Sequence, residues 1–274
     1  MMKTAAICAL ALSATILTTG CKKSPEKVDL GSTHTTAAET MAPSTEADEE
    51  DSTENTETPE NSAAASPEAS ATGNKRISTQ TSTYSSGKVS VAYPVVINME
   101  DTEKASAVNE LLKKNALSIL DAHQISDAED SLDVSCQVLS ADRNRITVLY
   151  TGTLAKKGAA DSTNIMYSNT IDVPNVSDIG FDHFADPYTM AGYVLSGDCA
   201  FYNVNDSLKA KLMDIKNNTS LEDYTNMFTN ADFPYEGGFP DSFSYENQGV
   251  IYFSIPVPHD LGDYAVVMFA PDSK

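Results

Sequence analysis

The spacing of apolar residues changes along the chain, and each spacing predicts a type of secondary structure. Residues 88–97 (KVSVAYPVVI) alternate apolar and polar side chains, which predicts a half-buried strand that ends or kinks near Pro94. Apolar residues then recur at helical spacing as far as about His123. Because Asp101 or Thr102 can cap the start of that stretch, the pattern predicts a long helix after the first strand.

The spacing returns to two after this helix and predicts a β-meander. Residues 132–138 and 146–150 both alternate, and the turn-like residues 141–144 (ADRN) separate them, which predicts a β-hairpin. Residues 165–173 continue the alternation. They are therefore expected to add a third strand.

The last 70 or so residues mix short helices with a second hairpin. Asn205 and Ser220 each precede a stretch with helical spacing and can cap it. Alternating residues flank the tight turn at 247–249 and predict a hairpin over residues 243–255. A last strand is expected over residues 264–269.

Local hairpins with helices packed on one face predict an α+β fold. The sequence shows no alternation of strand, helix and strand that would indicate a parallel sheet. About 200 residues suffice for one domain or for two small subdomains. We place the two subdomains at residues 84–183 and 184–274.

The start of the chain has the layout of a secretory signal. Lys3 precedes an apolar run over residues 5–17, which is shorter than the roughly 20 residues of a membrane-spanning helix. Residues 17–21 (LTTGC) resemble the bacterial lipoprotein signal motif. This resemblance implies cleavage after a signal peptide at residues 1–20, and diacylglycerol on the sulfur of Cys21. It predicts a protein anchored to the cell membrane and facing outside the cytoplasm, with an ordinary free cysteine as the alternative.

The segment that follows the predicted signal is acidic and has few large apolar residues. Residues 28–73 contain eleven Asp and Glu and no Lys or Arg, and are rich in Ser, Thr, Pro and Ala. Such a composition offers little apolar surface to bury, so we interpret residues 21–83 as a disordered tether. An acidic tail that collects a ligand or Ca²⁺ is the alternative. The net charge of −21 argues against nucleic acid as a partner, because binding to phosphates requires Lys and Arg.

Two cysteines remain in the expected folded part. Cys8 leaves with the signal and Cys21 serves as the anchor, so Cys136 and Cys199 could form one disulfide in an exported domain. Two buried thiols are the alternative, because sequence does not give the distance between their Cα atoms.

The order of the predicted elements resembles a known family. The segments VSVAYPVV, VNELL, NIMYSNTID and SFSYENQGVIYFSIPVPHDLGDYAVVMFAP are similar to the extracellular domain pair of the RsiV/PdaC type, over residues 84–270. The match is best at the end, where Phe243, Gly249, Pro256 and Tyr264 stand in the family's positions, although residues 264–267 lack the usual glycine. This pair occurs in an anti-sigma factor that binds lysozyme and beside a peptidoglycan deacetylase. The resemblance implies an extracellular domain, and it carries over neither signalling nor deacetylation.

The sequence offers few groups for catalysis. His123, His183 and His259 have no second His at the spacing of a metal site, and the one local cluster is residues 182–186 (DHFAD). No Gly-x-Ser-x-Gly motif is present. We predict no metal, no cofactor and no enzymatic activity. A dispersed pair of carboxylates acting on a glycan is the alternative.

Surface recognition is then the expected role. Tyr235 and Phe239 lie in the loop sequence YEGGFP, and His259 and Asp260 lie in PVPHD, and we predict that these four residues bind a ligand. The alternative is that the aromatic rings only cover the edge of a sheet. The expected partner is peptidoglycan or a basic extracellular protein such as lysozyme, whose approach the negative charge would accelerate.

These expectations combine into one function. The sequence predicts a lipid-anchored protein of the bacterial cell envelope with a non-catalytic domain that binds a cell-wall component or an extracellular protein. An enzyme acting on peptidoglycan or another glycan is one alternative, and an accessory subunit of a membrane complex is another.

Overall fold

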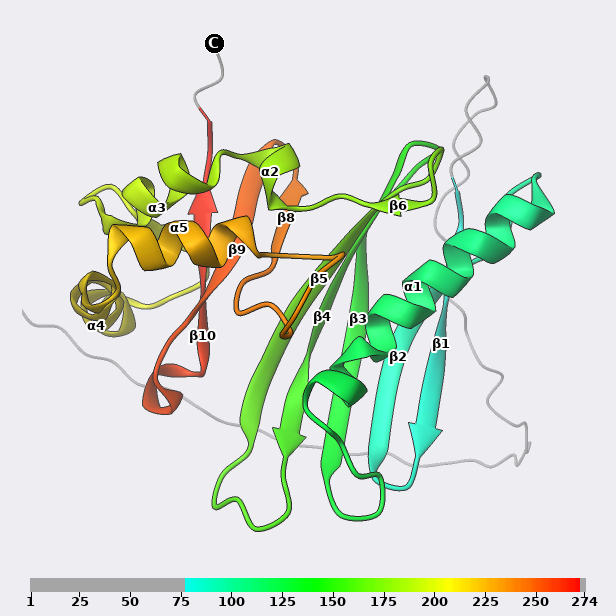
Figure 1. Ribbon diagram of the computed structural model, residues 1–274, viewed down its shortest axis with the longest axis horizontal. Helices are drawn as coiled ribbons and strands as arrows, with labels where there is room; N and C mark the ends of the chain where they lie inside the picture. The colour runs from blue at the N-terminus through cyan, green and yellow to red at the C-terminus, as the bar shows by residue number, and fades with distance from the viewer. Residues whose placement is uncertain (1–76, 272–274) are drawn as a thin grey trace, which may run out of the picture. The chain divides into compact units, whose positions relative to one another are not determined.

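The computed structural model describes residues 77–271, which form two β-sheets and the helices that cover them (Figure 1). The predicted signal peptide, the predicted anchor Cys21 and most of the predicted tether lie outside the described residues. The first strand, β1, begins at Thr79, inside the range 21–83 that the sequence assigned to the tether. Residues 79–83 therefore belong to a sheet, and the predicted end of the tether was too late.

The first sheet has six strands in the order β1-β2-β3-β4-β5-β6. Their bounds are β1 Thr79–Ser86, β2 Val89–Val96, β3 Ser131–Ala141, β4 Arg145–Ala155, β5 Thr163–Asp172 and β6 Ser177–Asp178. Neighbouring strands are antiparallel except β2 and β3, which pair in parallel with Val89 opposite Leu132. A crossover helix joins β2 to β3, so the expectation that no β-α-β unit is present was wrong.

That crossover helix is α1 (Thr102–Ala122), which lies across one face of the first sheet (Figure 1). Asp101 caps it, and its side chain accepts a hydrogen bond from the amide of Lys104 at 2.9 Å. The helix buries Val108, Leu112 and Ile119 against the sheet, together with the other members of the first core. The predicted helix is therefore confirmed.

The second sheet has four antiparallel strands in the order β7-β10-β9-β8. Their bounds are β7 Ala200–Phe201, β8 Ser244–Asn247, β9 Val250–Pro256 and β10 Tyr264–Phe269. The helices that accompany this sheet are α2 Phe181–Phe184, α3 Pro187–Leu195, α4 Asp206–Ile215 and α5 Leu221–Thr229, with short 3₁₀ turns at Lys216–Asn218 and His259–Leu261. Phe181, Phe228 and Phe253 meet in the second core, with ring centroids 5.0–5.5 Å apart. The α+β fold class is confirmed.

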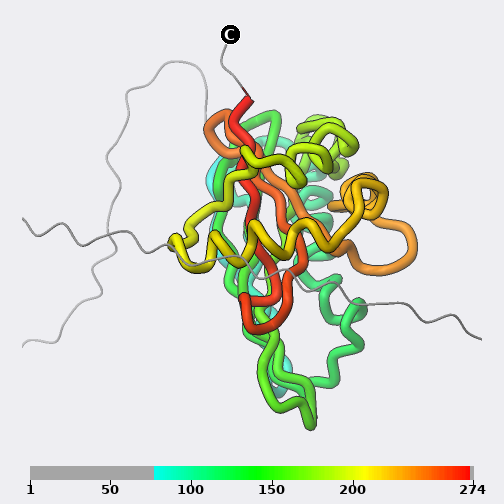
Figure 2. Tube along the Cα trace, turned by 90° about the vertical axis from the view of Figure 1, so that its left-hand side faces the viewer, coloured from blue at the N-terminus to red at the C-terminus, as the bar shows by residue number. Residues whose placement is uncertain are grey.

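The packing does not follow the sequence division between residues 183 and 184. That division cuts α2, whose Phe181 belongs to the second core. Phe233 and Phe243, from the C-terminal part, are buried in the first core. The described residues 77–271 all fall in one compact unit, and Figure 2 shows the last strands running beside the strands of the first sheet.

Polar contacts also join the two sheets. The hydroxyl of Ser168 on β5 donates to the carbonyl of Ser244 on β8 at 2.6 Å, where both side chains are buried. Arg145 at the start of β4 pairs with Glu246 on β8 at 2.9 Å. The outer face of the first sheet, opposite α1, is therefore fixed to the second sheet.

The two cysteines of the described part are free thiols. Cys136 packs against the first core, whereas Cys199 is buried in the second core. The disulfide considered from the sequence is therefore not formed. Within residues 77–271, no helix is long and apolar enough to cross a membrane.

Candidate functional site

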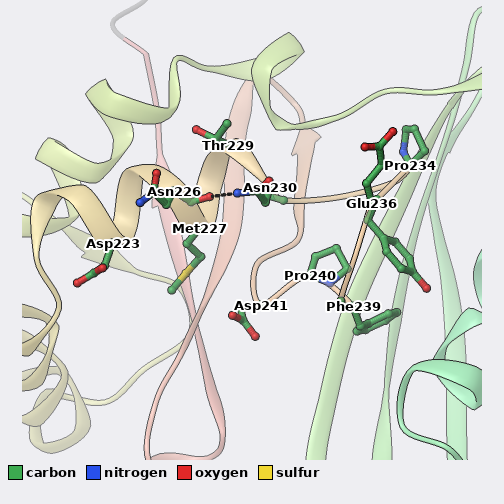
Figure 3. Close-up of a pocket in the computed structure, with 13 residues that line it drawn as sticks. Asp223, Asn226, Met227, Thr229, Asn230, Pro234, Glu236, Phe239, Pro240 and Asp241 are labelled. Atoms are coloured by element: carbon green, nitrogen blue, oxygen red, sulfur yellow. Dashed lines mark hydrogen bonds between the residues drawn. The ribbon is translucent and has the colours of Figure 1, made fainter.

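A cleft of about 800 Å³ lies between α5 and the loop that follows it (Figure 3). We call it the acidic cleft and define it by its carboxylates and side-chain amides, which are those of Asp223, Asn226, Asn230, Glu236 and Asp241. Among the 13 residues that line it, three are carboxylates and none is Lys or Arg. The lining of the cleft is therefore negatively charged, and no basic side chain in the lining neutralises it.

Helix α5 supplies one wall of the cleft, because one of its faces is buried in the second core and the other face is polar and lines the cleft. Ser220 caps the helix, and its side chain accepts a hydrogen bond from the amide of Asp223 at 3.0 Å. Tyr224 and Phe228 turn one face into the second core. The other face presents Asn226 and Met227 toward the cleft (Figure 3).

The end of the helix completes this wall. The side-chain amide of Asn230 donates to the carbonyl of Asn226 at 2.7 Å, which holds Asn230 against the last turn (Figure 3). Among residues 77–271, no group donates a hydrogen bond to the carbonyl oxygen of the Asn230 side chain. It can accept a hydrogen bond from a ligand.

The loop of residues 231–243 forms the other wall and is anchored at both ends. Phe233 and Phe243 are buried in the first core with their ring centroids 5.4 Å apart. Between these anchors, Glu236 is exposed, and Gly237 has a φ of 95°, a backbone conformation that favours glycine. The loop therefore presents a fixed tip to solvent.

The predicted binding residues Tyr235 and Phe239 both line the cleft, but they also have a structural role. Their ring centroids are 5.7 Å apart, and Phe239 lies 5.1 Å from Phe243 and 6.0 Å from Tyr167 of the first core. Both residues are half-buried. The rings thus cover the first core and leave part of their surface to the cleft, and their binding of a ligand stays a prediction.

The other two predicted binding residues lie elsewhere. His259 and Asp260 are exposed in the 3₁₀ turn between β9 and β10, and neither lines the acidic cleft. The imidazole Nδ1 of His259 lies 2.8 Å from a carboxylate oxygen of Asp263. This hydrogen bond raises the pKa of His259. The four predicted residues are therefore not brought together in one site.

Two polar residues of the DHFAD segment, His183 and Asp186, have other partners. Asp186 caps α3, where its carboxylate accepts a hydrogen bond from the amide of Thr189 at 2.8 Å. His183 Nε2 lies 3.3 Å from a guanidinium nitrogen of Arg145. Across residues 77–271, no group of three or more His, Cys, Asp or Glu is placed to hold a metal ion.

Sequence reasoning missed the carboxylates and amides of the cleft. A signal was present in the segment SLEDYTNMFTN, where Asp223, Asn226 and Asn230 recur at helical spacing opposite the buried Tyr224 and Phe228. Such a polar stripe is typical of any solvated helix face. Only the return of the chain at residues 234–241 turns this stripe into one wall of a cleft.

The buried carboxylate of Asp232 joins the two ends of the loop through its hydrogen bonds with Ser244. Asp232 is 3% exposed, and burial raises its pKa to about 7, although hydrogen bonds from Ser244 act in the opposite direction. The nearby carboxylates of Asp178 and Asp182 raise the pKa further. At neutral pH this group is therefore close to the midpoint of its titration.

The lining of the cleft determines what it can bind. Carboxylates accept hydrogen bonds and attract cations, and side-chain amides both donate and accept. The lining contains neither His nor Cys, so the pairing of a nucleophile with an imidazole base is not built into it. The arrangement suits recognition of a positively charged surface.

Comparison with known proteins gives structural neighbours of the DUF3298 family. A member of that family from Bacteroides fragilis aligns over 72% of this chain and 90% of its own, with 12% identity and a TM-score of 0.36. A DUF3298 family protein from Pseudomonas aeruginosa aligns over 72% of this chain and 92% of its own, with 10% identity and a TM-score of 0.39. No protein-family model and no curated protein matches the sequence. The resemblance to the RsiV/PdaC-type pair stays a prediction.

Proposed function

We propose that this protein is a lipid-anchored, non-catalytic recognition protein of the bacterial cell envelope, which binds a basic extracellular protein through the acidic cleft. One observation carries the proposal: three carboxylates and no Lys or Arg line a cleft of about 800 Å³. A cationic partner would find its counter-charges already gathered there. A lysozyme-like protein has the required charge.

The overall negative charge of the chain also favours a basic partner. A net charge of −21 attracts a basic protein over a distance and raises the rate of encounter, and salt screens this effect. Exposed ion pairs are each worth only about 0.2–1 kcal/mol. Affinity would therefore require several such pairs, together with the parts of the Tyr235 and Phe239 rings that face the cleft.

The proposed anchor is Cys21, with the acidic segment as the spacer between membrane and domain. At about 3.3 Å per extended residue, fifty residues can span more than 100 Å. Metabolic labelling with a fatty-acid probe tests the anchor, because the label is expected in the wild-type protein and is expected to be lost in Cys21→Ser. Labelling that persists in Cys21→Ser would contradict lipidation at this residue.

Binding is tested by calorimetry of the full-length protein with lysozyme as the basic probe. The cleft variant combines Asp223→Asn, Glu236→Gln and Asp241→Asn. Its matched control removes the same charge from exposed residues outside the cleft, by Glu110→Gln, Asp121→Asn and Asp133→Asn. We expect about tenfold weaker binding for the cleft variant and a much smaller change for the control.

Four outcomes would contradict the proposal. An equal loss in both triple variants would mean that the charge acts without a site. Binding of peptidoglycan fragments but not lysozyme would favour a cell-wall ligand, and binding of neither would direct the search to a membrane complex. Peptidoglycan fragments recovered with an altered mass would show an enzyme.

A further inference from the structure

A second cavity, of about 360 Å³, lies between the outer face of β4 and β5 and the second sheet. Its polar lining consists of Tyr202, Tyr245, Tyr264, Asn164, Asn203 and Thr151, and we call it the tyrosine pocket. It shares no lining residue with the acidic cleft. Its volume lies within the range of about 300–1,000 Å³ that small-molecule sites occupy.

The charge of this lining is unusual for the chain. None of the residues that line the pocket is Asp, Glu, Lys or Arg, in a protein with a net charge of −21. The rest of the lining is mostly aliphatic and includes Leu149, Met166 and Leu208. An apolar wall with a few uncharged polar groups is typical of a site for a small neutral ligand.

The tyrosines gather here because the strands of the second sheet alternate. Phe253 on β9 and Val267 on β10 point into the second core, so Tyr252 points to the opposite face. Tyr245 on β8 stands opposite Tyr252 in register, and the two rings stack at 5.0 Å. Tyr202 meets Tyr252 edge-on at 5.3 Å. The outermost ring of this row, Tyr202, is 50% exposed.

The tyrosine hydroxyls are available as neutral hydrogen-bonding groups. Burial and the neighbouring tyrosines raise the pKa of Tyr245 to about 12, so its hydroxyl keeps its proton at neutral pH. Within residues 77–271, no protein group forms a hydrogen bond with the hydroxyl of Tyr202, Tyr245 or Tyr264. A ligand in the pocket can therefore use them as donors or acceptors.

A network of polar contacts fixes the rim of the pocket. The backbone amide of Asn164 on β5 donates to the carboxylate of Asp263 at 2.7 Å, and its side-chain amide donates to the same oxygen at 3.1 Å. His259 holds the other carboxylate oxygen at 2.8 Å. Asp263 lies between Gly262 and Tyr264, which both line the pocket. His259 is thus a positioning residue for the rim.

We propose that the tyrosine pocket binds an uncharged sugar ring of a glycan, with the ring stacked on Tyr202. The apolar face of a sugar packs on an aromatic ring, and its hydroxyls pair with uncharged amides and phenols. A charged ligand would find no counter-charge in this lining. The proposal does not depend on the acidic cleft, because the two sites have separate linings.

The test is calorimetry of the full-length protein with N-acetylglucosamine oligomers, which are uncharged. Tyr202→Ala removes the stacking ring, and Tyr188→Ala is its matched control, because Tyr188 is 61% exposed and does not line the pocket. We expect about tenfold weaker binding for Tyr202→Ala and unchanged binding for Tyr188→Ala. Tyr202→Phe, which keeps the ring, is expected to retain most of the affinity.

Further measurements separate this site from the cleft. The glucosamine oligomer, which is cationic, is expected to bind the pocket less tightly than the acetylated one. The cleft triple variant is expected to keep its affinity for the acetylated oligomer, and Tyr202→Ala to keep its affinity for lysozyme. The proposal is overturned if no acetylated oligomer binds at about 10 mM. It is also overturned if Tyr202→Ala and Tyr188→Ala bind equally.

Discussion

The carboxylate of Asp232 accepts two hydrogen bonds from Ser244, one from the main-chain amide at 2.6 Å and one from the hydroxyl at 2.5 Å. Asp232 follows α5 and has a φ of 65°, and Ser244 is the first residue of β8. Both residues are buried. This contact closes the loop whose tip forms one wall of the acidic cleft, so the cleft depends on a carboxylate that titrates near neutral pH.

The titration of Asp232 makes stability depend on pH. Its pKa is raised from 3.8 to about 7 in the folded state, so the folded state binds the proton more tightly than the unfolded state does. The stability that Asp232 contributes is therefore fully present below about pH 4 and is lost as the pH rises from about 4 to about 7. The full effect is up to about 4 kcal/mol at 1.36 kcal/mol per pKa unit.

Asp232→Asn isolates this contribution. The substitution keeps an acceptor for the amide of Ser244 and leaves Asp178 and Asp182 in place. We expect urea unfolding at about pH 4 and about pH 8 to show that the wild type loses more free energy of unfolding than the variant over this interval. Parallel pH profiles for the two proteins would show that Asp232 titrates as it does in the unfolded chain.

Two glycines are expected to respond in opposite directions to the same substitution. A Cβ on Gly152 in β4 would stand 2.0 Å from the carbonyl oxygen of Asp133 on the paired strand. Gly152→Ala is therefore expected to lower the free energy of unfolding by about 2 kcal/mol or more. Gly192 lies in α3 with open space around it, so Gly192→Ala is expected to raise the free energy of unfolding by about 0.5–1 kcal/mol.

Thermal or urea unfolding of the two glycine variants measures both changes in the free energy of unfolding. The pair controls for the added methyl group, because the change in sequence is the same. A stable Gly152→Ala protein would mean that β3 and β4 are farther apart than the structure shows.

The two thiols are expected to differ in reactivity. Cys199 is 3% exposed, and burial raises its pKa to about 11, whereas Cys136 is only half-buried, and burial raises its pKa as well. Since the thiolate is the reactive form, Cys136 should be alkylated at least about tenfold faster than Cys199 in the native protein. Iodoacetamide labelling with peptide mass spectrometry measures both rates. A disulfide between the two residues in the non-reduced protein would refute this.

The contact between His259 and Asp263 is also expected to depend on pH. The hydrogen bond and charge of Asp263 raise the pKa of His259 above 6.5. A raised histidine pKa contributes stability that is fully present below about pH 6.5 and is lost as the pH rises through the folded-state pKa. The melting temperature of the wild type should therefore exceed that of His259→Gln at about pH 5.5, and the two should converge in alkaline solution.

NMR titration provides the matching control for this contact. The imidazole of His259 should titrate above its ordinary pKa in the wild type and near it in Asp263→Asn. If the imidazole titrates at the same pH in both proteins, the contact does not hold the rim of the tyrosine pocket.

Local features could be predicted from sequence because they depend on neighbours in the chain. Asp101, Asn205 and Ser220 cap helices through bonds to amides three residues away, and such bonds can be anticipated from residue type and spacing. The hairpin of β3 and β4 and that of β8 and β9 also follow from alternation and turn residues. Tyr235 and Phe239 could also be predicted as binding residues, because they lie in one short segment of the sequence, YEGGFP.

What only the tertiary structure decided are the contacts between distant segments. Alternation along β2 and β3 does not show that they pair in parallel, since the pairing depends on how α1 crosses the sheet. Likewise, Asp223 and Asp241 face one cleft because Phe233 and Phe243 enter the first core and fix the return of the chain. The sequence by itself determined the helices α1, α4 and α5, the hairpins β3–β4 and β8–β9, and the charge of this protein. The packing of two cores onto each other decided its cleft and its tyrosine pocket, because both form between segments far apart in the chain.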